Sequence, residues 1–271
     1  PGKLHGTIAA IPSKSQAHRL LICAAFADNQ TTLICPDTNR DIEATAACLR
    51  ALGAEIQRMD WGYVINPIVN IPKIATLNCE ESGSTLRFLL PVVGALGVDA
   101  TFQMEGRLPQ RPLSPLWEEM ERMGCLLSRP DEKSVKCVGR LSAGVYRIDG
   151  GVSSQYVTGL LFAMAIMDGM SSLQITGKLE SKPYVTMTQH ALNLFGVNSE
   201  SYTIIGSLPF HSPGQINVEG DWSNAAFFLA ANALGSGLTI SGLASDSPQG
   251  DRSVCQILDQ LQSHCEISAA D

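Results

Sequence analysis

The chain has 271 residues, of which 45% are hydrophobic and 17% are charged, and its formal net charge at pH 7 is −7. A chain of this length can bury the core of one large domain or of two modest ones. The negative charge argues against a nucleic-acid-binding scaffold, which would carry a basic stripe, but it leaves room for a phosphorylated small molecule held by a local cluster of cations.

The first predicted helix begins at Lys14-Ser15 and continues into an apolar run at residues 20–26. Ser is favoured at helix starts because its side chain accepts hydrogen bonds from the free amides of the first turn. Arg19 lies one turn after Ser15, on the same face of the helix. Lys14, Ser15 and Arg19 could therefore surround an anion, although the same three residues also fit a solvated helix start.

The second predicted helix begins in Ser82-Gly83-Ser84 and continues into the apolar residues 88–96. A Gly at this point would let a ligand approach the backbone closely. The loop at residues 107–112 follows, and it holds Arg107 and Arg111 between prolines. Two such Arg side chains could clamp a carboxylate or a phosphate, although the loop by itself fits a solvated surface equally well.

The third predicted helix begins in Ser153-Ser154-Gln155 and continues into the apolar residues 157–166. The segment Ser181-Lys182-Pro183-Tyr184 follows in the same unit. Hydroxyl, amide and Tyr side chains in these numbers fit a polyhydroxylated ring that carries a phosphate. The sequence contains neither a phosphate-binding Gly-x-x-x-x-Gly-Lys-[Ser/Thr] loop nor a strand-borne Gly-x-Gly-x-x-Gly, so it gives no support to nucleotide binding.

These helix starts recur at a regular interval, and the spacing predicts a repeated unit of about seventy residues. Ser15, Ser84, Ser154 and Ser223 are separated by 69, 70 and 69 residues. A second series, in which a Gly ends an amphipathic stretch and precedes a strand-like run, falls at Gly53, Gly124 and Gly196.

Each unit is therefore predicted to contain a strand, a buried helix, a strand, an amphipathic helix and one or two closing strands. Three units are complete, and a fourth is predicted to begin near Ile216, with its buried helix at 225–234 and its amphipathic helix at about 253–262. All four apolar helices are expected to be buried nearly all round. The fourth unit ends before its closing strands, so we expect the natural chain to continue beyond Asp271.

The eight cysteines show no C-x-x-C pair and no Cys/His zinc spacing, and the five histidines form no ligand cluster. We therefore expect reduced thiols, a cytoplasmic protein, and neither a metal nor a cofactor. No apolar run approaches the length needed to span a membrane.

Six short motifs in order resemble the family of 5-enolpyruvylshikimate-3-phosphate synthases, which are enolpyruvyl transferases. The resemblance extends from Lys3 to about Asp259. The motifs are Ser-Lys-Ser-x-x-x-Arg, a Gly-[Thr/Ser]-x-x-Arg helix start, Arg-Pro before the second amphipathic helix, Ser-Ser-Gln, Ser-Lys-Pro-Tyr and Val-Glu-Gly-Asp.

The resemblance implies an α/β fold of repeated βαβαββ units around a pseudo-threefold axis, arranged as two domains. On that pattern, residues 12–218 form one complete domain of three units. Residues 1–11 and 219–271 belong to the other domain, which holds one unit of its three. The family's pattern also implies a monomer with no nucleic-acid or membrane partner.

The reaction implied by the resemblance moves the enolpyruvyl group of phosphoenolpyruvate onto the 5-hydroxyl of shikimate 3-phosphate and releases phosphate. Lys14 would contact both substrates as the catalytic cation. The residues implied for the shikimate 3-phosphate side are Ser15, Arg19, Ser153, Ser154, Ser181 and Tyr184. Those implied for the phosphoenolpyruvate side are Gly83, Arg111 and Gln155, and Gly83 would also abut the competing inhibitor glyphosate.

Three departures from the family pattern are visible. The stretch Pro12-Ser13-Lys14-Ser15 is one Gly shorter than the usual motif. Glu81 occupies the place of an Asn that usually contacts phosphoenolpyruvate, and we expect its carboxylate to orient Arg111 instead. The family's acidic base, its general-acid Lys and two further Arg would lie beyond Asp271, which predicts that the 271-residue chain alone does not turn over.

Two other functions remain open at this point. The sister family that acts on UDP-N-acetylglucosamine has a Lys-Asn at its first helix and usually a Cys in the loop before Arg-Pro. Here Lys14 is followed by Ser15 and residues 102–110 contain no Cys, so the sequence disfavours that family. A non-catalytic fragment that binds a phosphorylated metabolite is the other alternative, and activity and binding assays would separate the two.

Overall fold

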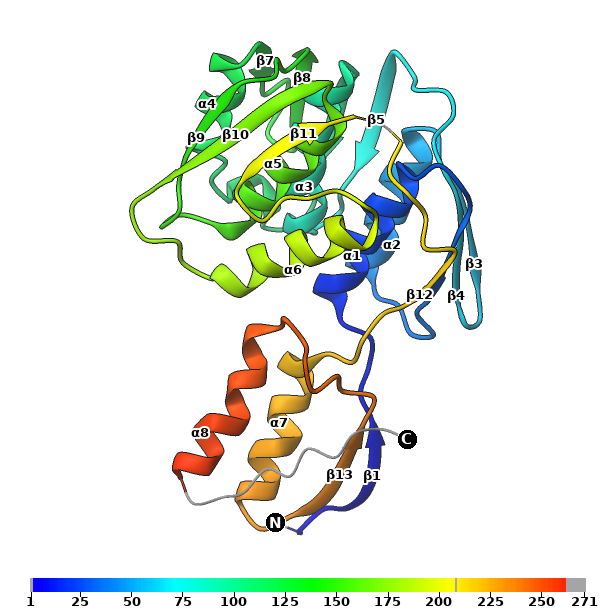
Figure 1. Cartoon of the computed structure of the whole chain (residues 1–271), viewed down its shortest axis with the longest axis vertical. Coiled ribbons are helices and arrows are strands. Elements are labelled where there is room, and N and C mark those ends of the chain that lie inside the picture. The colour runs from blue at the N-terminus through cyan, green and yellow to red at the C-terminus, as the bar shows by residue number, and fades with distance from the viewer. Residues whose placement is uncertain (1, 208, 262–271) are drawn as a thin grey trace.

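The computed structural model describes residues 2–207 and 209–261, which form a large lobe and a smaller lobe below it (Figure 1). The chain passes between the lobes twice, at residues 10–13 and at residues 218–221. The small lobe contains β1 (His5–Ala9), α7 (Trp222–Ala233), β13 (Gly237–Ser241), the 3₁₀ turn η2 (Gly250–Ser253) and α8 (Val254–Gln260).

Three sheets of the large lobe share one pattern of strand pairing. The first, in the order β12-β2-β4-β3, consists of β2 (Thr31–Ile34), β3 (Glu55–Met59), β4 (Gly62–Asn66) and β12 (Gln215–Asn217). The second, in the order β5-β6-β8-β7, consists of β5 (Ile74–Asn78), β6 (Asp99–Gln103), β7 (Cys125–Ser128) and β8 (Ser134–Gly139). The third, in the order β9-β10-β11, consists of β9 (Val145–Asp149), β10 (Gly169–Thr176) and β11 (Thr203–Gly206).

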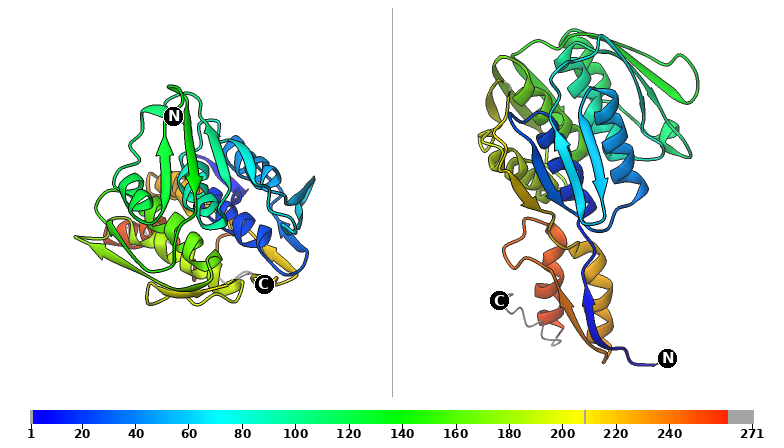
Figure 2. Two further views of the ribbon diagram at one scale, coloured as in Figure 1. Left: turned by 90° about the horizontal axis from the view of Figure 1, so that it is seen from above. Right: turned by 90° about the vertical axis from the view of Figure 1, so that its right-hand side faces the viewer.

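In every one of these sheets the first two strands run parallel and the next pairs antiparallel. A parallel pair needs a crossover connection, and a buried helix supplies it in the second and third sheets, whereas β2 and β12 of the first sheet lie far apart in the chain. Seen from above, the three sheets surround the buried helices (Figure 2). The predicted α/β fold built from repeated units is therefore confirmed.

The helices form an inner and an outer set. The inner helices are α1 (Lys14–Ala25), α3 (Gly83–Leu96) and α5 (Ser154–Ile166), and the outer ones are α2 (Arg40–Ala51), α4 (Leu116–Arg122) and α6 (Lys182–Leu194). Nearly every residue of the inner helices is buried, as their apolar sequences predict. Helix α5 approaches α3 so closely that a Cβ at Gly159 would lie 2.2 Å from the Arg87 carbonyl oxygen, so only Gly fits there.

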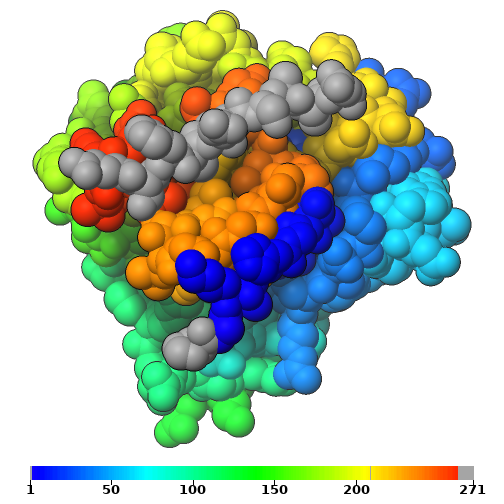
Figure 3. Space-filling model, turned by 90° about the horizontal axis from the view of Figure 1, so that it is seen from below, coloured from blue at the N-terminus to red at the C-terminus, as the bar shows by residue number. Residues whose placement is uncertain are grey.

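Two strands pair outside the unit that their sequence position suggests. The strand around Ile216 was expected to begin a fourth unit, but β12 pairs in parallel with β2 and completes the sheet of the first unit. In the small lobe, β1 pairs in parallel with β13, over the whole of His5–Ala9. Figure 3 shows this blue strand beside the orange segment on the underside of the molecule. In each lobe, a sheet thus includes a strand that is distant in the sequence: β12 in the large lobe and β1 in the small lobe.

Helix α7 is not the all-round buried helix that its sequence predicts. Of its residues only Trp222 and Ala225 are buried, while the side chain of Phe227 is 77% exposed and that of Leu234, just after the helix, is 86% exposed. Each inner helix of the large lobe is covered by other helices, as α3 is by α5. The described part of the small lobe offers α7 only α8, η2 and the β1–β13 sheet, so an apolar sequence is left uncovered. The amphipathic helix expected at about 253–262 is α8, and residue 262 lies outside the described residues.

The prediction of reduced thiols agrees with the structure for the cysteines of the large lobe. Those with free, buried thiols are Cys23, Cys35, Cys48, Cys79, Cys125 and Cys137. Cys265 lies outside the described residues. Among the described helices, none is both long enough and apolar enough to cross a membrane.

A buried chain of hydrogen bonds joins the first units of the large lobe at His18. Its Nδ1 lies 2.7 Å from the Thr45 hydroxyl, which lies 2.7 Å from the Thr85 hydroxyl, which in turn donates to Ser82 Oγ at 2.7 Å. The other ring nitrogen, Nε2, is buried and has no hydrogen-bond partner among the described residues. Burial lowers the pKa of His18 from 6.5 to about 3, so the ring is neutral at physiological pH.

We expect His18 to make the protein sensitive to acid. Below pH 6.5 the unfolded chain takes up a proton at His18 that the folded chain does not, so stability falls as pH falls toward 3. The advantage of wild type over His18→Gln should therefore shrink by about 1.4 kcal/mol per pH unit between about pH 6 and pH 4. Denaturant unfolding at several pH values measures it, with His5→Gln, at an exposed position, as the control. A constant difference would contradict the prediction.

Candidate active site

The starts of the inner helices and of α7 lie together between the lobes. Gln155 Nε2 donates to Ser84 Oγ at 3.1 Å, which places the starts of α5 and α3 side by side. The buried side chain of Gln249 bonds both Ser13, before α1, and the Trp222 amide, in α7. These bonds agree with the prediction that the four helix starts face one side. Helix N-termini carry free amides and a partial positive charge, so such a cluster favours anions.

Lys14 is held at the start of α1 by a partner on a neighbouring helix. Its Nζ lies 3.0 Å from Asp41 Oδ2 in the first turn of α2, and the two side chains are 46% and 34% exposed. The hydroxyl of Thr85, in the first turn of α3, lies 3.4 Å from the backbone carbonyl of Asp41. The ammonium group is therefore accessible to a ligand while a carboxylate keeps it in place. Ser15 follows it in the first turn, half-buried.

Arg19 faces inward, with its side chain only 2% exposed. The guanidinium donates to the Ser15 carbonyl at 2.6 Å and to the Tyr184 carbonyl at 2.9 Å, and it lies 5.0 Å over the Phe88 ring. Its Nε donates to the Thr188 hydroxyl at 2.9 Å. Burial lowers its pKa to about 9, which still leaves it protonated at neutral pH. In this structure Arg19 supports α1 and α6 more than it faces a ligand.

Two Arg side chains pack against the start of α3. A Cβ at Gly83 would lie 2.6 Å from Arg111 Nη1 and 2.9 Å from Arg87 Nη1, so both guanidinium groups pack against this Gly. The backbone of Gly83 is not left-handed. Arg87 is 4% exposed and donates to Gln155 Oε1 at 2.7 Å, and its buried Nε has no partner in the part of the chain that the structure describes. In the described part of the chain, neither Arg87 nor Arg111 is paired with a carboxylate.

Glu81 does not orient Arg111 as the sequence led us to expect. Its carboxylate accepts a hydrogen bond from the backbone amide of Arg107 at 3.1 Å and packs against Gly106. The reason is local, because Glu81 is exposed just before α3 and the turn at 106–107 lies next to it. Glu81 therefore fixes the loop that leads to Arg111 and does not touch the Arg111 guanidinium.

The start of α5 adds polar groups to the site. Ser153 Oγ accepts from the Gln155 amide at 3.2 Å as the cap of α5, and Ser154 is buried in its first turn. At the start of α6, Ser181 has a left-handed backbone with φ of 55°, and its hydroxyl makes no capping bond. Tyr184 is 37% exposed and bonds Ser223 of the small lobe, and burial raises its pKa.

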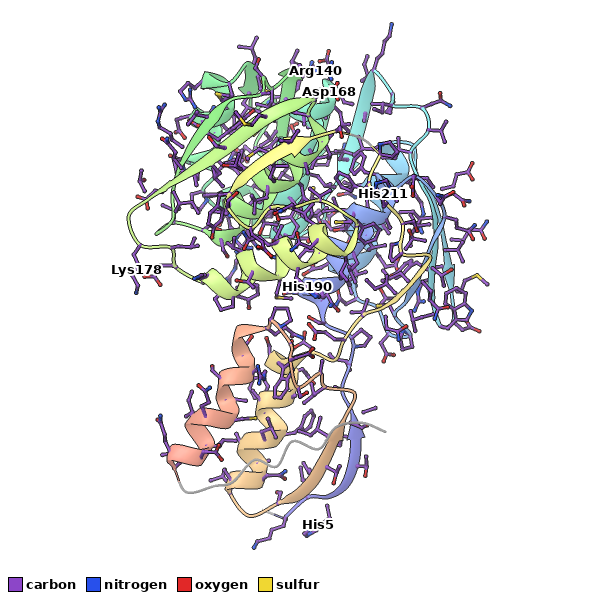
Figure 4. All side chains as sticks on the ribbon, in the orientation of Figure 1. His5, Arg140, Asp168, Lys178, His190 and His211 are labelled. Atoms are coloured by element: carbon purple, nitrogen blue, oxygen red, sulfur yellow. The ribbon has the colours of Figure 1, made fainter. Side chains whose placement is uncertain are left out.

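The structure thus gathers five of the predicted site residues into two groups. Gly83, Arg111 and Gln155 lie at the α3 start, and Ser181 and Tyr184 lie where α6 approaches the small lobe. The described residues contain no group of three or more His, Cys, Asp or Glu that could hold a metal ion. Figure 4 shows His5, His190 and His211 far apart, on the small lobe, on α6 and beside the first sheet respectively.

Sequence reasoning gave no role to three residues of this region. Arg87 belongs to the Gly-[Thr/Ser]-x-x-Arg motif at the start of α3 and lies three residues after Ser84, so this motif could have identified its role. Asp41 and Gln249 come from other elements, and no local pattern marks either of them. Lys14, Arg87 and Arg111, together with three helix starts, can hold a ligand that carries two anionic groups.

Comparisons with known proteins agree with this geometry. The family model described as EPSP synthase (3-phosphoshikimate 1-carboxyvinyltransferase) matches residues 1–271. The 3-phosphoshikimate 1-carboxyvinyltransferase of Clostridium kluyveri is 40% identical over 267 residues, and that of Clostridium beijerinckii is 39% identical over 275 residues. Both alignments cover 96% of this chain and 63% of the relative, so the chain spans less than two thirds of their length.

Solved structures of the same family share the fold. The structure of EPSP synthase from Acinetobacter baumannii superposes with a TM-score of 0.78 at 23% sequence identity. The superposition covers 97% of this chain and 61% of that one. The topology of the two lobes is therefore that of an enolpyruvyl transferase.

Proposed function

The chain belongs to the EPSP synthase family, and we propose that the protein it forms, or forms part of, transfers the enolpyruvyl group of phosphoenolpyruvate to shikimate 3-phosphate. The acceptor is the 5-hydroxyl, and inorganic phosphate is released. The family membership supports the reaction, and the residues at the helix starts support the substrate class.

The observation that carries the proposal is the pair of guanidinium groups at Gly83, neither of which forms an ion pair with a carboxylate of the described residues. Two cations that share one helix start repel each other, and Arg111 accordingly lowers the pKa of Arg87 in addition to the larger effect of burial. Such a pair is stabilised when an anion binds between them. Phosphoenolpyruvate carries both a carboxylate and a phosphate, which suits a site of two guanidinium groups with Lys14 nearby.

In the proposed reaction the oxygen of the 5-hydroxyl adds to C2 of phosphoenolpyruvate while C3 gains a proton, and the tetrahedral adduct then loses phosphate from C2 and a proton from C3, which restores the double bond. Charge builds up on the phosphate as it leaves, and fixed cations stabilise that charge without reorganising. Lys14 and Arg111 would supply this stabilisation, while Gln155 would be held in place by Arg87. Ser15, Ser153, Ser154, Ser181 and Tyr184, with Arg19 beneath them, would hold the phosphorylated ring. The proposal requires neither a metal nor a cofactor.

We further propose that residues 12–218 act as one complete domain, and that residues 1–11 and 219–271 belong to a second. The exposed apolar face of α7 supports this division, because it has the sequence of an inner helix without the neighbours of one. We also propose that the protein acts as a monomer in the cytoplasm.

The test is an assay of phosphate release with phosphoenolpyruvate and shikimate 3-phosphate together, made on the protein as its gene encodes it and on the 271-residue chain. We expect release from the gene-encoded protein only when both substrates are present. Binding of shikimate 3-phosphate by calorimetry without any phosphate release would favour the alternative of a binding protein. Release with UDP-N-acetylglucosamine as the acceptor would favour the sister activity and overturn the proposal.

A further inference from the structure

A single buried amide, Gln249, joins the two lobes where the chain passes between them. Gln249 is 6% exposed and lies between β13 and η2 of the small lobe. Its Oε1 accepts from Ser13 Oγ at 3.2 Å and from the Trp222 amide at 3.1 Å, and its Nε2 donates to the Gly220 carbonyl at 2.8 Å. The carboxyl of Glu219, whose pKa burial raises, lies beside this side chain. Three of the four hydrogen bonds that a Gln side chain can make are therefore formed.

The groups that Gln249 bonds are those that set the direction of two helices. Ser13 is the N-cap of α1, and its Oγ accepts from the Gln16 amide at 3.4 Å. Trp222 is the first residue of α7. Because the Ser13 hydroxyl hydrogen is donated to Gln249, the oxygen lone pairs are left facing α1. One carboxamide thus fixes the start of a large-lobe helix against the start of a small-lobe helix.

The backbone around Gln249 forms a short ladder between the two passages. Ser13 N donates to the Glu219 carbonyl at 2.8 Å, and Asp221 N donates to the Ile11 carbonyl at 2.8 Å. Two further backbone bonds tie these passages to the end of β13: Ala10 N donates to the Ser241 carbonyl at 2.9 Å and Gly220 N donates to the Gly242 carbonyl at 3.0 Å. The side chain of Gln249 adds bonds to Ser13, Gly220 and Trp222 at this ladder and so links both passages.

We propose that Gln249 is a positioning residue for the anion site: it fixes Lys14 and Ser15, the first residues of α1, relative to the small lobe. The inference rests on the proposed function, because it concerns the binding of shikimate 3-phosphate between the lobes. Gln249 itself would not touch the substrate. It acts through Ser13, whose neighbour Lys14 carries the charge.

The first experiment compares Gln249→Met with Gln256→Met, a control with the same substitution at an exposed position of α8. Calorimetry on the gene-encoded protein measures the Kd for shikimate 3-phosphate. Loss of three buried hydrogen bonds leaves Ser13 Oγ and the Trp222 amide without their partner, so we expect binding about tenfold weaker in Gln249→Met and unchanged in Gln256→Met.

A double-mutant cycle with Ser13→Ala separates positioning from a merely structural role. If Gln249 acts through Ser13, the double variant should bind shikimate 3-phosphate no more weakly than the weaker single variant. Ser13→Ala is the milder change and keeps the test valid if Gln249→Met folds poorly. Lowered melting temperatures with an unchanged Kd in both single variants, or additive losses in the cycle, would overturn the inference. Absence of binding by wild type would instead overturn the proposed function, and the inference with it.

Discussion

Replacing Lys14 by Met is expected to weaken the binding of both phosphoenolpyruvate and shikimate 3-phosphate by about 100-fold, with little change in the free energy of unfolding. The cation is lost from a site where helix starts and guanidinium groups converge, and each charged hydrogen bond to a ligand contributes about 1.5–3 kcal/mol. The Asp41 carboxylate would stay 3.0 Å from the former Nζ position and would then repel anions. Both side chains are half exposed, so the ion pair itself adds little to stability.

Calorimetry and denaturant unfolding of the gene-encoded protein measure the two quantities. Lys133→Met, at an exposed turn, is the matched control and should change neither. Asp41→Asn should keep or increase the affinity for both anions, because it removes the competing carboxylate and leaves the ammonium group in place. Unchanged affinity in Lys14→Met would show that Lys14 is only a solvated charge at a helix start.

Arg19 differs from Lys14 in being buried. Arg19→Ala should weaken shikimate 3-phosphate most, but its burial means that the same change also removes support from Ser15, Tyr184 and Thr188. Removing a buried charged partner costs several kcal/mol of stability. Lys14 therefore gives the cleaner test of anion binding.

Replacing Gly83 by Ala is expected to lower glyphosate sensitivity strongly in the gene-encoded protein, with a smaller rise in the KM for phosphoenolpyruvate. The added methyl would lie 2.6 Å from Arg111 Nη1 and 2.9 Å from Arg87 Nη1, so both guanidinium groups must shift. The backbone at Gly83 is helical and not left-handed, so the substitution itself costs the fold little. Glyphosate is the longer of the two ligands, so it should lose more binding affinity than phosphoenolpyruvate when a methyl group is added at this helix start.

Inhibition by glyphosate and initial rates against phosphoenolpyruvate measure this selectivity. The effect should pass through Arg111, so Gly83→Ala combined with Arg111→Ala should be no worse for phosphoenolpyruvate than Arg111→Ala alone. An equal loss for every ligand, or unchanged binding of both, would contradict the steric explanation. A lowered melting temperature in Gly83→Ala would show that the Gly serves the backbone instead.

Much of the site could be predicted from local chemistry. Ser13, Ser82 and Ser153 each cap a helix through a bond to an amide two or three residues ahead, so the sequence alone marks where the helices begin. The glycines after the amphipathic helices, such as Gly53 and Gly196, have the left-handed backbone that their position predicts. The repeat of about seventy residues is visible in the sequence because these capping serines and terminal glycines recur in each unit.

Local patterns do not predict contacts between side chains that are distant in the chain. Ser15-x-x-x-Arg19 and Ser84-x-x-Arg87 look alike in the sequence, yet Arg19 is bonded to carbonyls and hydroxyls while Arg87 packs beside Arg111 against Gly83. The difference comes from the elements that cover each helix, which short-range patterns do not contain.

The sequence by itself determined the helix starts, the helix ends and the repeated unit, because capping and periodicity act within a few residues. Only the tertiary structure decided that β12 completes the first sheet, that β1 pairs with β13, that α7 stays uncovered, and that Gln249 bonds Ser13. Each of these contacts joins residues far apart in the chain or depends on what packs alongside. Their energies come from burial and pairing, which a stretch of sequence acquires only when its neighbours in space are in place.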